Sequence, residues 1–130
     1  MKKINLAIQK SGRLNKESIS LLEKAGIKFD NFKDQLKVDC QNFPLNIYFL
    51  RNSDIPRYLS DGVVDIAIIG QNLIQESELN IDEIMNLNFS RCRVSIAIPL
   101  NMKYSGLKDL NNLKIATSYP NTVKKYLKDN

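Results

Sequence analysis

The sequence predicts an α/β fold built around a mixed sheet. Short apolar runs of strand length alternate with segments in which apolar residues recur at helical spacing. The turn Asn42-Phe43-Pro44 separates two strand-like runs and indicates a hairpin within that sheet. The 130 residues, 43% of them hydrophobic and 25% charged, suit one globular domain or one domain with the start of a second.

The first part of the chain predicts a buried strand followed by a helix. The apolar residues 4–8 form the strand, which ends at the polar loop 9–13. We expect Asn15 to cap the helix, because its side chain can accept a bond from a backbone amide in the first turn. Gly26 is a natural end for this helix.

The next segment predicts the hairpin, a second helix and a buried strand. Apolar and polar residues alternate over 36–40, and residues 47–49 supply the second strand of the hairpin. A helix follows over 53–62, where Ser53 caps it, proline is tolerated in the first turn and glycine ends it. The apolar run 63–69 is typical of a strand covered on both faces, and a short helix over 72–76 follows.

The last third of the chain predicts two further strands and a final helix. The strands cover 94–98 and 114–118, with a helical turn over 107–110 between them. Asn121 is expected to cap the helix over 122–128.

A domain boundary is predicted in the polar, turn-like stretch 101–106. Residues 1–100 would then form a first, catalytic-type lobe. Residues 101–130 would form the start of a second, truncated lobe.

Composition excludes several kinds of chemistry. The chain has no histidine, so it cannot supply a Ser-His-Asp triad, a Cys-His dyad or a His-ligated metal. Cys40 and Cys92 have no metal-ligand spacing, and each is expected to be a small buried hydrophobic residue in a reducing compartment. No signal peptide or membrane span is present, which makes the cytoplasm the expected location.

The net charge of +5 suits an anionic ligand or a generally basic surface. The basic residues are scattered, whereas a nucleic-acid binder more often gathers them in one stripe. We therefore expect neither a nucleic acid nor a membrane as partner.

The loop after the first predicted strand has the parts of a phosphate site. Ligands collect at the carboxyl ends of strands in open α/β sheets, and the amino terminus of a helix attracts anions. Gly12 allows the backbone to approach an anion closely, while Lys10 and Arg13 add positive charge. The loop lacks Walker A spacing, and an exposed basic turn is the alternative interpretation.

Further candidates follow the later strands. Gly70, at a strand end, leaves room for a ligand, and Asn72 could cap the next helix or bond a ligand hydroxyl. Arg51 also follows a strand, but it could instead pair with Asp54. Asp65, a carboxylate in an apolar run, is expected to pair with a backbone amide or a nearby arginine rather than to act in catalysis.

Two short motifs in the last third complete the set. Arg93 could contact phosphate or form a surface salt bridge, and Cys92 lacks the base that a reactive thiol needs. Thr117 and Tyr119 stand between a predicted strand and a helix. The tyrosine ring could stack on an adenine, or it could be buried with its hydroxyl bonded.

In their order along the chain, these motifs resemble the front portion of the ATP phosphoribosyltransferase family. They are Gln9-Lys10-Ser11-Gly12-Arg13-Leu14, the stretch from Asp54 to Gly70, Cys92-Arg93 and Ile115 to Pro120, and they look like the long form of the family. The resemblance implies that the substrate-binding residues are Lys10, Gly12, Arg13, Arg51, Gly70, Asn72, Arg93, Thr117 and Tyr119. No catalytic residue, general base or metal ligand is assigned.

The resemblance also implies a fold and a reaction. The whole enzyme is expected to have two type II periplasmic-binding-protein-like lobes around a cleft and to form homo-oligomers. It would transfer the phosphoribosyl group of phosphoribosyl pyrophosphate to N1 of ATP with Mg²⁺. The later segment that holds phosphoribosyl pyrophosphate is absent, so this chain is expected to be inactive alone. The alternative is a small-molecule binding or sensing module on the same fold.

Overall fold

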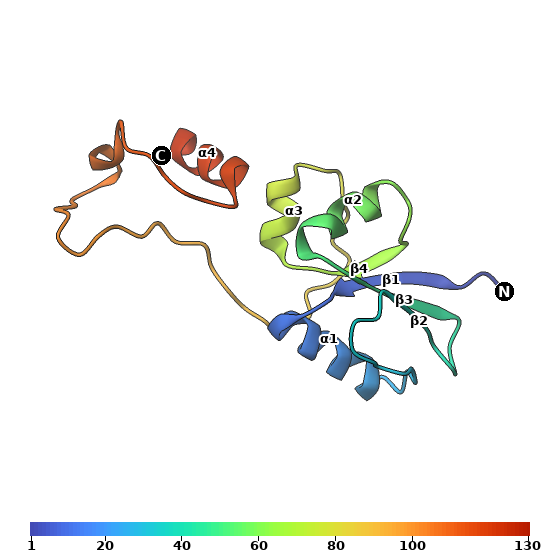
Figure 1. Ribbon diagram of the computed structural model, residues 1–130. Coiled ribbons are helices and arrows are strands. Elements are labelled where there is room, and N and C mark those ends of the chain that lie inside the picture. The colour runs from blue at the N-terminus through green and yellow to red at the C-terminus, as the bar shows by residue number, and fades with distance from the viewer. The chain divides into compact units, whose positions relative to one another are not determined.

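The computed structural model describes residues 1–130, and its centre is a four-stranded mixed sheet with the order β2-β3-β1-β4 (Figure 1). Strands β1 (Ile4–Gln9), β3 (Leu45–Leu50) and β4 (Ile66–Ile68) run parallel to one another. Strand β2 (Lys37–Asp39) pairs antiparallel with β3. The predicted α/β class, the mixed sheet and the hairpin are confirmed.

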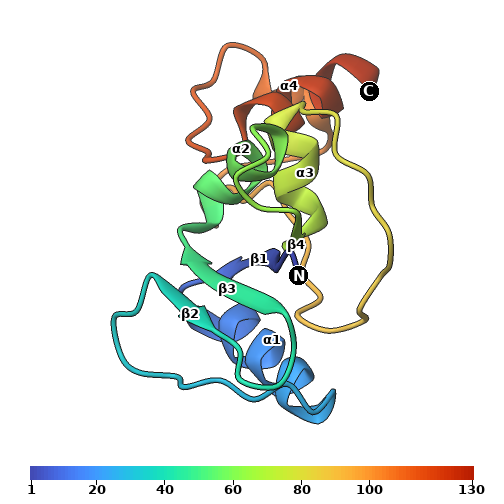
Figure 2. The same cartoon turned by 90° about the vertical axis from the view of Figure 1, so that its right-hand side faces the viewer.

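Helices cover both faces of this sheet. Helix α1 (Gly12–Lys24) lies on one face, and α2 (Ile55–Ser60) and α3 (Gln71–Ser77) lie on the other (Figures 1 and 2). A 3-10 turn over Asn52–Asp54 leads from β3 into α2. The short predicted helix at 72–76 is therefore confirmed as α3.

Each face of the sheet has its own hydrophobic core. Ile8, Ile47 and Leu22 of α1 belong to the first core, and Ala7 and Ile55 of α2 belong to the second. Successive strand residues point to opposite faces, which is why neighbours Ala7 and Ile8 serve different cores. Both of these side chains are completely buried, so β1 is fixed from both sides.

The strand predicted over 63–69 is shorter than expected. The amides of Val63 and Val64 bond the carbonyl of Tyr58 at 3.0 and 3.3 Å, so this part of the run closes the end of α2 instead of joining the sheet. The remainder, β4, is the outermost strand and pairs only with β1, and Ile66 is 38% exposed. The expected cover on both faces is confirmed in part, because Ile68 packs against one core and Ala67 and Ile69 pack against the other, while Ile66 stays exposed.

The ends of the helices differ from the predicted caps. Helix α1 begins at Gly12 with Ser11 at the N-cap, and Asn15 lies inside the helix. The side chain of Asn15 donates to the Gln9 carbonyl at 2.8 Å instead of capping. Gly26 follows the helix with φ 82°, as its predicted role at the end requires.

In the helix predicted over 53–62, by contrast, the cap lies one position later than predicted. Asp54 rather than Ser53 is its N-cap residue, and the proline lies in the first turn as expected. Gly62 follows the helix with φ 71°, which is the left-handed region that favours glycine.

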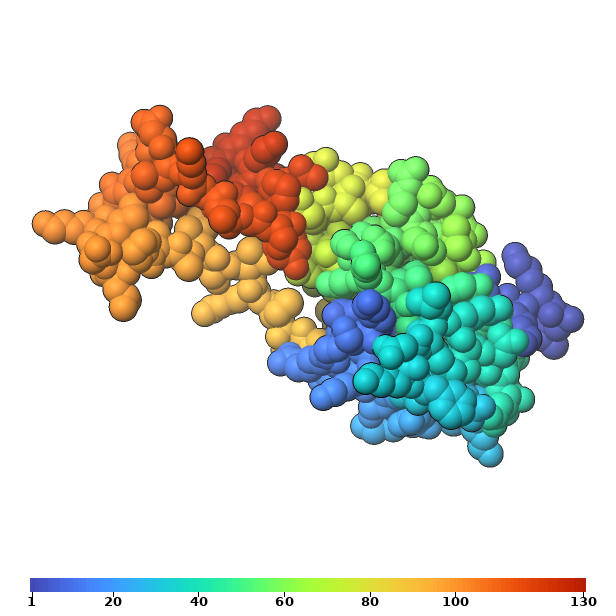
Figure 3. Space-filling view, viewed as in Figure 1, coloured from blue at the N-terminus to red at the C-terminus, as the bar shows by residue number.

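The chain divides into two compact units, Met1–Arg91 and Cys92–Asn130, whose residues can be followed by colour in Figure 3. The second unit contains a 3-10 turn over Leu107–Leu110, which was predicted, and helix α4 (Pro120–Asp129). Tyr119 is at the N-cap of α4, so the predicted cap at Asn121 is wrong. The lobe division at residues 100 and 101 remains a prediction.

The strands predicted over 94–98 and 114–118 are wrong for this structure. Neither segment forms a strand, and Val94, Ile96 and Ile115 are 47%, 39% and 39% exposed. A strand depends on backbone bonds to a neighbour, and every strand pairing in the structure lies in the first unit. The alternation of apolar residues in these segments predicted strands, but no neighbouring strand is present to pair with them.

The two cysteines also differ. Cys40 is buried, as predicted, and burial raises the pKa of its thiol. Cys92 is exposed, so the expectation of burial is wrong there. Without the strand over 94–98 there is no inner sheet face to receive it. None of the helices combines the length and the apolar composition that a membrane-spanning helix needs.

Candidate functional site

Three loops meet at one edge of the sheet. Strands β1, β3 and β4 are parallel, so their carboxyl ends, at Gln9, Leu50 and Ile68, lie at the same edge. The amide of Lys10 bonds the Leu50 carbonyl at 2.9 Å, which carries the pairing beyond the ends of the strands. Six of the predicted site residues belong to these loops and the helix starts beyond them: Lys10, Gly12, Arg13, Arg51, Gly70 and Asn72.

The loop after β1 turns directly into α1. Gly12 has φ 86°, a conformation that a side chain would strain. Ser11, at the N-cap, makes no side-chain bond to the first turn. The first amides of α1 therefore have no side-chain cap, as suits an anion at a helix amino terminus. Asn15 ties this turn to the end of β1, a positioning contact that the sequence analysis assigned to capping.

Two exposed cations at this edge have no acidic partner. Lys10 and Arg51 are exposed, and neither forms an ion pair. The alternative pairing of Arg51 with Asp54 is not formed; their one contact is a backbone bond of 3.0 Å. Both charges are therefore available to an anion.

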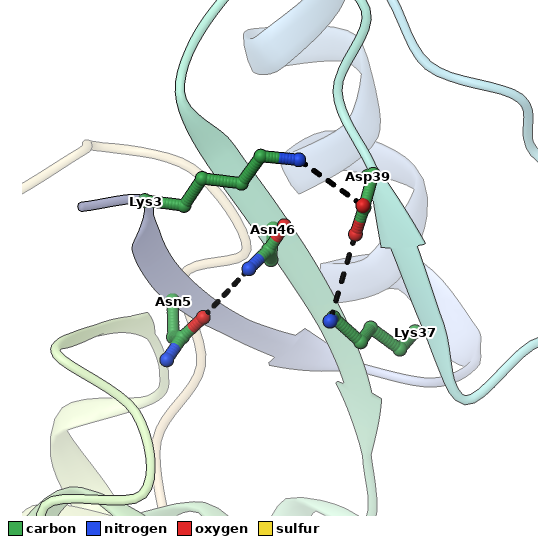
Figure 4. Close-up of polar contacts among 5 residues, drawn as sticks. All are labelled: Lys3, Asn5, Lys37, Asp39 and Asn46. Atoms are coloured by element: carbon green, nitrogen blue, oxygen red, sulfur yellow. Dashed lines mark hydrogen bonds and ion pairs between the residues drawn. The ribbon is translucent and has the colours of Figure 1, made fainter. Parts of the chain in front are cut away.

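The cations at the opposite edge of the sheet are already paired. Lys3 and Lys37 lie 3.1 and 3.6 Å from the carboxylate of Asp39 (Figure 4). The hydrogen bond from Lys3 is the main cause that holds the pKa of Asp39 below its usual value. Beside this group, the side chain of Asn46 donates to that of Asn5 at 3.0 Å. These charges are paired within the structure, whereas those of Lys10 and Arg51 are not.

Asp65 is likewise engaged within the structure rather than available to a ligand. Its carboxylate accepts the Asn5 amide at 2.8 Å, and its own amide bonds the Asn5 carbonyl at 2.8 Å. The predicted pairing with a backbone amide is confirmed. Asp65 therefore anchors β4 to β1.

Arg13, the third predicted cation of this edge, is engaged by other groups. Its Nε lies 3.7 Å from the Glu17 carboxylate, and its Nη2 donates to the Arg91 carbonyl at 3.2 Å. The hydroxyl of Ser90 also bonds Glu17. The i,i+4 spacing of Arg13 and Glu17 could have indicated the first contact. Nothing in the sequence indicated the contact with the segment more than seventy residues away.

Gly70 and Asn72 are positioned together. Gly70 is the N-cap residue of α3, so the predicted capping role of Asn72 is wrong. The side-chain oxygen of Asn72 occupies the space that a Cβ at residue 70 would need. Glycine at position 70 thus allows the Asn72 amide to lie against the strand end.

The remaining predicted residues belong to the second unit. Arg93 is exposed and forms no ion pair, so its alternative role in a salt bridge is not seen. The Thr117 hydroxyl accepts the Tyr119 amide at 2.9 Å, and Tyr119 is half-buried at the start of α4. Within this unit, the two residues form one local turn.

The first unit is thus an α/β fold that offers unpaired cations and an uncapped helix terminus beside parallel strand ends. Comparison with known proteins agrees with an anion-binding α/β protein and identifies its family. The family model HisG, described as ATP phosphoribosyltransferase, matches residues 51–130. This chain belongs to the ATP phosphoribosyltransferase family.

Similar proteins extend the match to the amino terminus. The ATP phosphoribosyltransferase of Cytophaga hutchinsonii is 48% identical over 127 residues, which are 98% of this chain and 44% of that protein. The enzyme of Bacteroides thetaiotaomicron is 42% identical, over 98% of this chain and 45% of its own length. The ATP phosphoribosyl transferase (HisG:HisZ) complex from Thermotoga maritima matches with a TM-score of 0.55 and 28% identity, covering 63% of this chain and 39% of that one.

Those coverages also set the extent of the match. The chain spans less than half the length of the curated relatives it matches.

Proposed function

We propose that this chain contributes the ATP-binding edge of an ATP phosphoribosyltransferase. That enzyme would transfer the phosphoribosyl group of phosphoribosyl pyrophosphate to N1 of ATP, the first step of histidine biosynthesis. One observation carries the proposal. Lys10 and Arg51 are unpaired cations at neighbouring strand ends, while Lys3 and Lys37 at the opposite ends of the strands share the carboxylate of Asp39.

Each residue of the edge has a task in this proposal. Lys10 and Arg51 attract the triphosphate, and Arg can bond two phosphate oxygens at once. Gly12 lets the uncapped amides of α1 approach the phosphates, with Arg13 beside them. Asn72, lying against Gly70, bonds a nucleotide hydroxyl.

The second unit would add contacts to the same nucleotide. Tyr119 would stack on the adenine ring, and Thr117 and Arg93 would contact phosphate. These roles rest on the family resemblance of their motifs.

The reaction places particular demands on these residues. N1 of adenine attacks the anomeric carbon of the ribose while pyrophosphate leaves. Two anionic substrates must be held close together, and charge that develops on the leaving group must be neutralised. Fixed amides and cationic side chains meet the first demand, and no covalent nucleophile is needed.

Mg²⁺ is part of the proposal as an ion associated with the substrate phosphates. No group of three or more acidic, cysteine or histidine side chains lies together in the structure. The residues present therefore do not form a protein-made magnesium site, and no step is assigned to the ion. Phosphate oxygens themselves are ligands that Mg²⁺ prefers.

The proposal includes an architecture for the whole enzyme. The first unit would form most of one type II periplasmic-binding-protein-like lobe, and homo-oligomers would form in the cytoplasm. By itself, this chain would bind adenine nucleotide weakly and would not turn over.

Titration separates this function from that of an unrelated binding module. ATP is titrated into the chain, followed by phosphoribosyl pyrophosphate with Mg²⁺, and pyrophosphate release is assayed. We expect weak ATP binding and no release. A chain that ignores both substrates and binds another small acid would contradict the enzyme proposal, and robust turnover would contradict the proposed inactivity of the chain alone.

A further inference from the structure

Arg13 is the proposed phosphate contact that is already occupied. Its guanidinium meets the Glu17 carboxylate at 3.7 Å and the Arg91 carbonyl at 3.2 Å. We propose that Glu17, Ser90 and Arg91 form a latch on Arg13, and that a polyphosphate bound by Arg13 opens this latch and frees residues 88–91. The inference rests on the proposed function of Arg13.

Arg13 and Ser90 both contact the same carboxylate oxygen of Glu17. Oε2 of Glu17 accepts the Ser90 hydroxyl and is also the atom closest to Nε of Arg13. Figure 1 shows the chain after α3 returning to the first turn of α1, where these contacts are made. A ligand that draws Arg13 away therefore removes one anchor of the segment directly and leaves Glu17 without its cation.

Residues 88–91, the segment held by the latch, include two residues with positive φ. Ser90 has φ 49°, a left-handed region that residues other than glycine and asparagine seldom adopt, and Asn88 beside it has φ 59°. The turn is supported by its own bonds, from the Asn88 amide to Asn86 at 2.9 Å and from Arg91 to Asn88 at 3.1 Å. Such backbone persists only where surrounding contacts hold it. The segment is therefore ready to relax when the contacts with α1 are lost.

The strengths of the competing contacts favour opening. The side chains of Arg13 and Glu17 are 68% and 37% exposed, and exposed ion pairs are weak. Charge-assisted bonds from arginine to phosphate are stronger and can be bidentate. A polyphosphate at Arg13 would also repel the nearby Glu17 carboxylate. Opening would loosen residue 91, where the first compact unit ends.

Trypsin reports the state of this latch directly. The bond after Arg91 contains the carbonyl that accepts the Arg13 hydrogen bond. Its cleavage rate, followed by mass spectrometry, is divided by the rate after the exposed Lys103 of the second unit as an internal reference. The test variant is Glu17→Gln. The control is Asp61→Asn, which removes the exposed i,i+4 pair between Arg57 and Asp61 in α2.

We expect Glu17→Gln to raise the relative cleavage after Arg91 about two- to fivefold, the range set by an exposed ion pair. Asp61→Asn should leave it unchanged. Inorganic triphosphate should give a similar increase in the wild-type chain, and Glu17→Gln should bind triphosphate more tightly in calorimetry.

The contrary outcomes distinguish the two proposals. A Glu17→Gln chain that is cleaved like Asp61→Asn overturns the latch, whatever binds at the site. Triphosphate binding without faster cleavage after Arg91 overturns the opening step alone. No triphosphate binding at all overturns the opening step together with the proposed phosphate role of Arg13.

Discussion

The two units of this chain use apolar residues in opposite ways. In the first, Ile8, Ile47 and Ile55 are completely buried around a paired sheet. In the second, Leu110 is the one buried apolar residue, while the apolar residues Val94, Ile96 and Ile115 are exposed. The difference teaches that alternating apolar residues predict a strand only where neighbouring strands exist to receive its backbone and its side chains.

The sharpest test of this comparison is a matched pair of truncations. Ile47→Ala should lower the free energy of unfolding by about 2–5 kcal/mol, because it leaves a cavity in the packed core. Ile96→Ala, at a 39% exposed position, should change it by less than about 0.5 kcal/mol. Urea unfolding followed by far-UV circular dichroism measures both. Equal losses would show that residues 94–98 are packed after all.

Glycine substitutions sharpen the comparison at the level of the backbone. Gly12→Ala should cost about 1–2 kcal/mol, because φ 86° is strained for a residue with a side chain. Gly106→Ala, in the second unit, should be tolerated, since its backbone is extended and nothing lies within 4 Å of the added carbon. Thermal unfolding of both variants provides the measurement. A tolerated Gly12→Ala would show that the loop after β1 can rearrange freely.

Gly70→Ala tests a smaller effect, confined to the site. The added methyl group would take the place of the Asn72 amide, whose flexible end can move aside at little cost in stability. We expect unchanged unfolding and a loss of ATP affinity of about two- to tenfold, the range for one hydrogen bond of about 0.5–1.5 kcal/mol. Nuclear magnetic resonance titration measures the affinity. Unchanged affinity would remove Asn72 from the proposed site.

The smallest effect concerns the acid side of the pH range. Hydrogen bonding to Lys3 lowers the pKa of Asp39 below its ordinary value of 3.8, so the folded state favours the carboxylate. That contribution is fully present above the ordinary pKa and is lost as the pH falls through the lowered one. Urea midpoints between about pH 5 and pH 2 should therefore fall less steeply in Asp39→Asn than in the wild-type chain. Parallel curves would contradict this sign.

Local patterns in the sequence predicted most of the first unit. The apolar run of β1, the apolar face of α1 and the turn at Pro44 each depend on neighbours a few residues away. The caps were misplaced by one to four positions: Ser11 and Tyr119 lie before the predicted caps Asn15 and Asn121, and Asp54 lies one position after Ser53. Such choices depend on where the preceding strand or turn delivers the chain.

Only part of the candidate site could likewise be predicted from local sequence patterns. The cations at strand ends were predictable, because topology places parallel carboxyl ends at one edge. The engagement of Arg13 was not, since its contact with Arg91 joins segments 78 positions apart. The exposure of Val94 was likewise unpredictable, because it depends on a missing strand neighbour.

The most direct test of the proposed ATP edge compares two charge-matched variants. Arg51→Ala removes an unpaired cation from the carboxyl edge, and Lys37→Ala removes one that pairs with Asp39 near the opposite edge. In an ATP titration, Arg51→Ala should weaken binding by about tenfold or more, since a bond to a charged group contributes about 1.5–3 kcal/mol. Lys37→Ala should stay within about twofold of the wild-type chain, as expected for an exposed pair. Equal losses would show that ATP responds to net charge alone and would contradict a site at the strand ends.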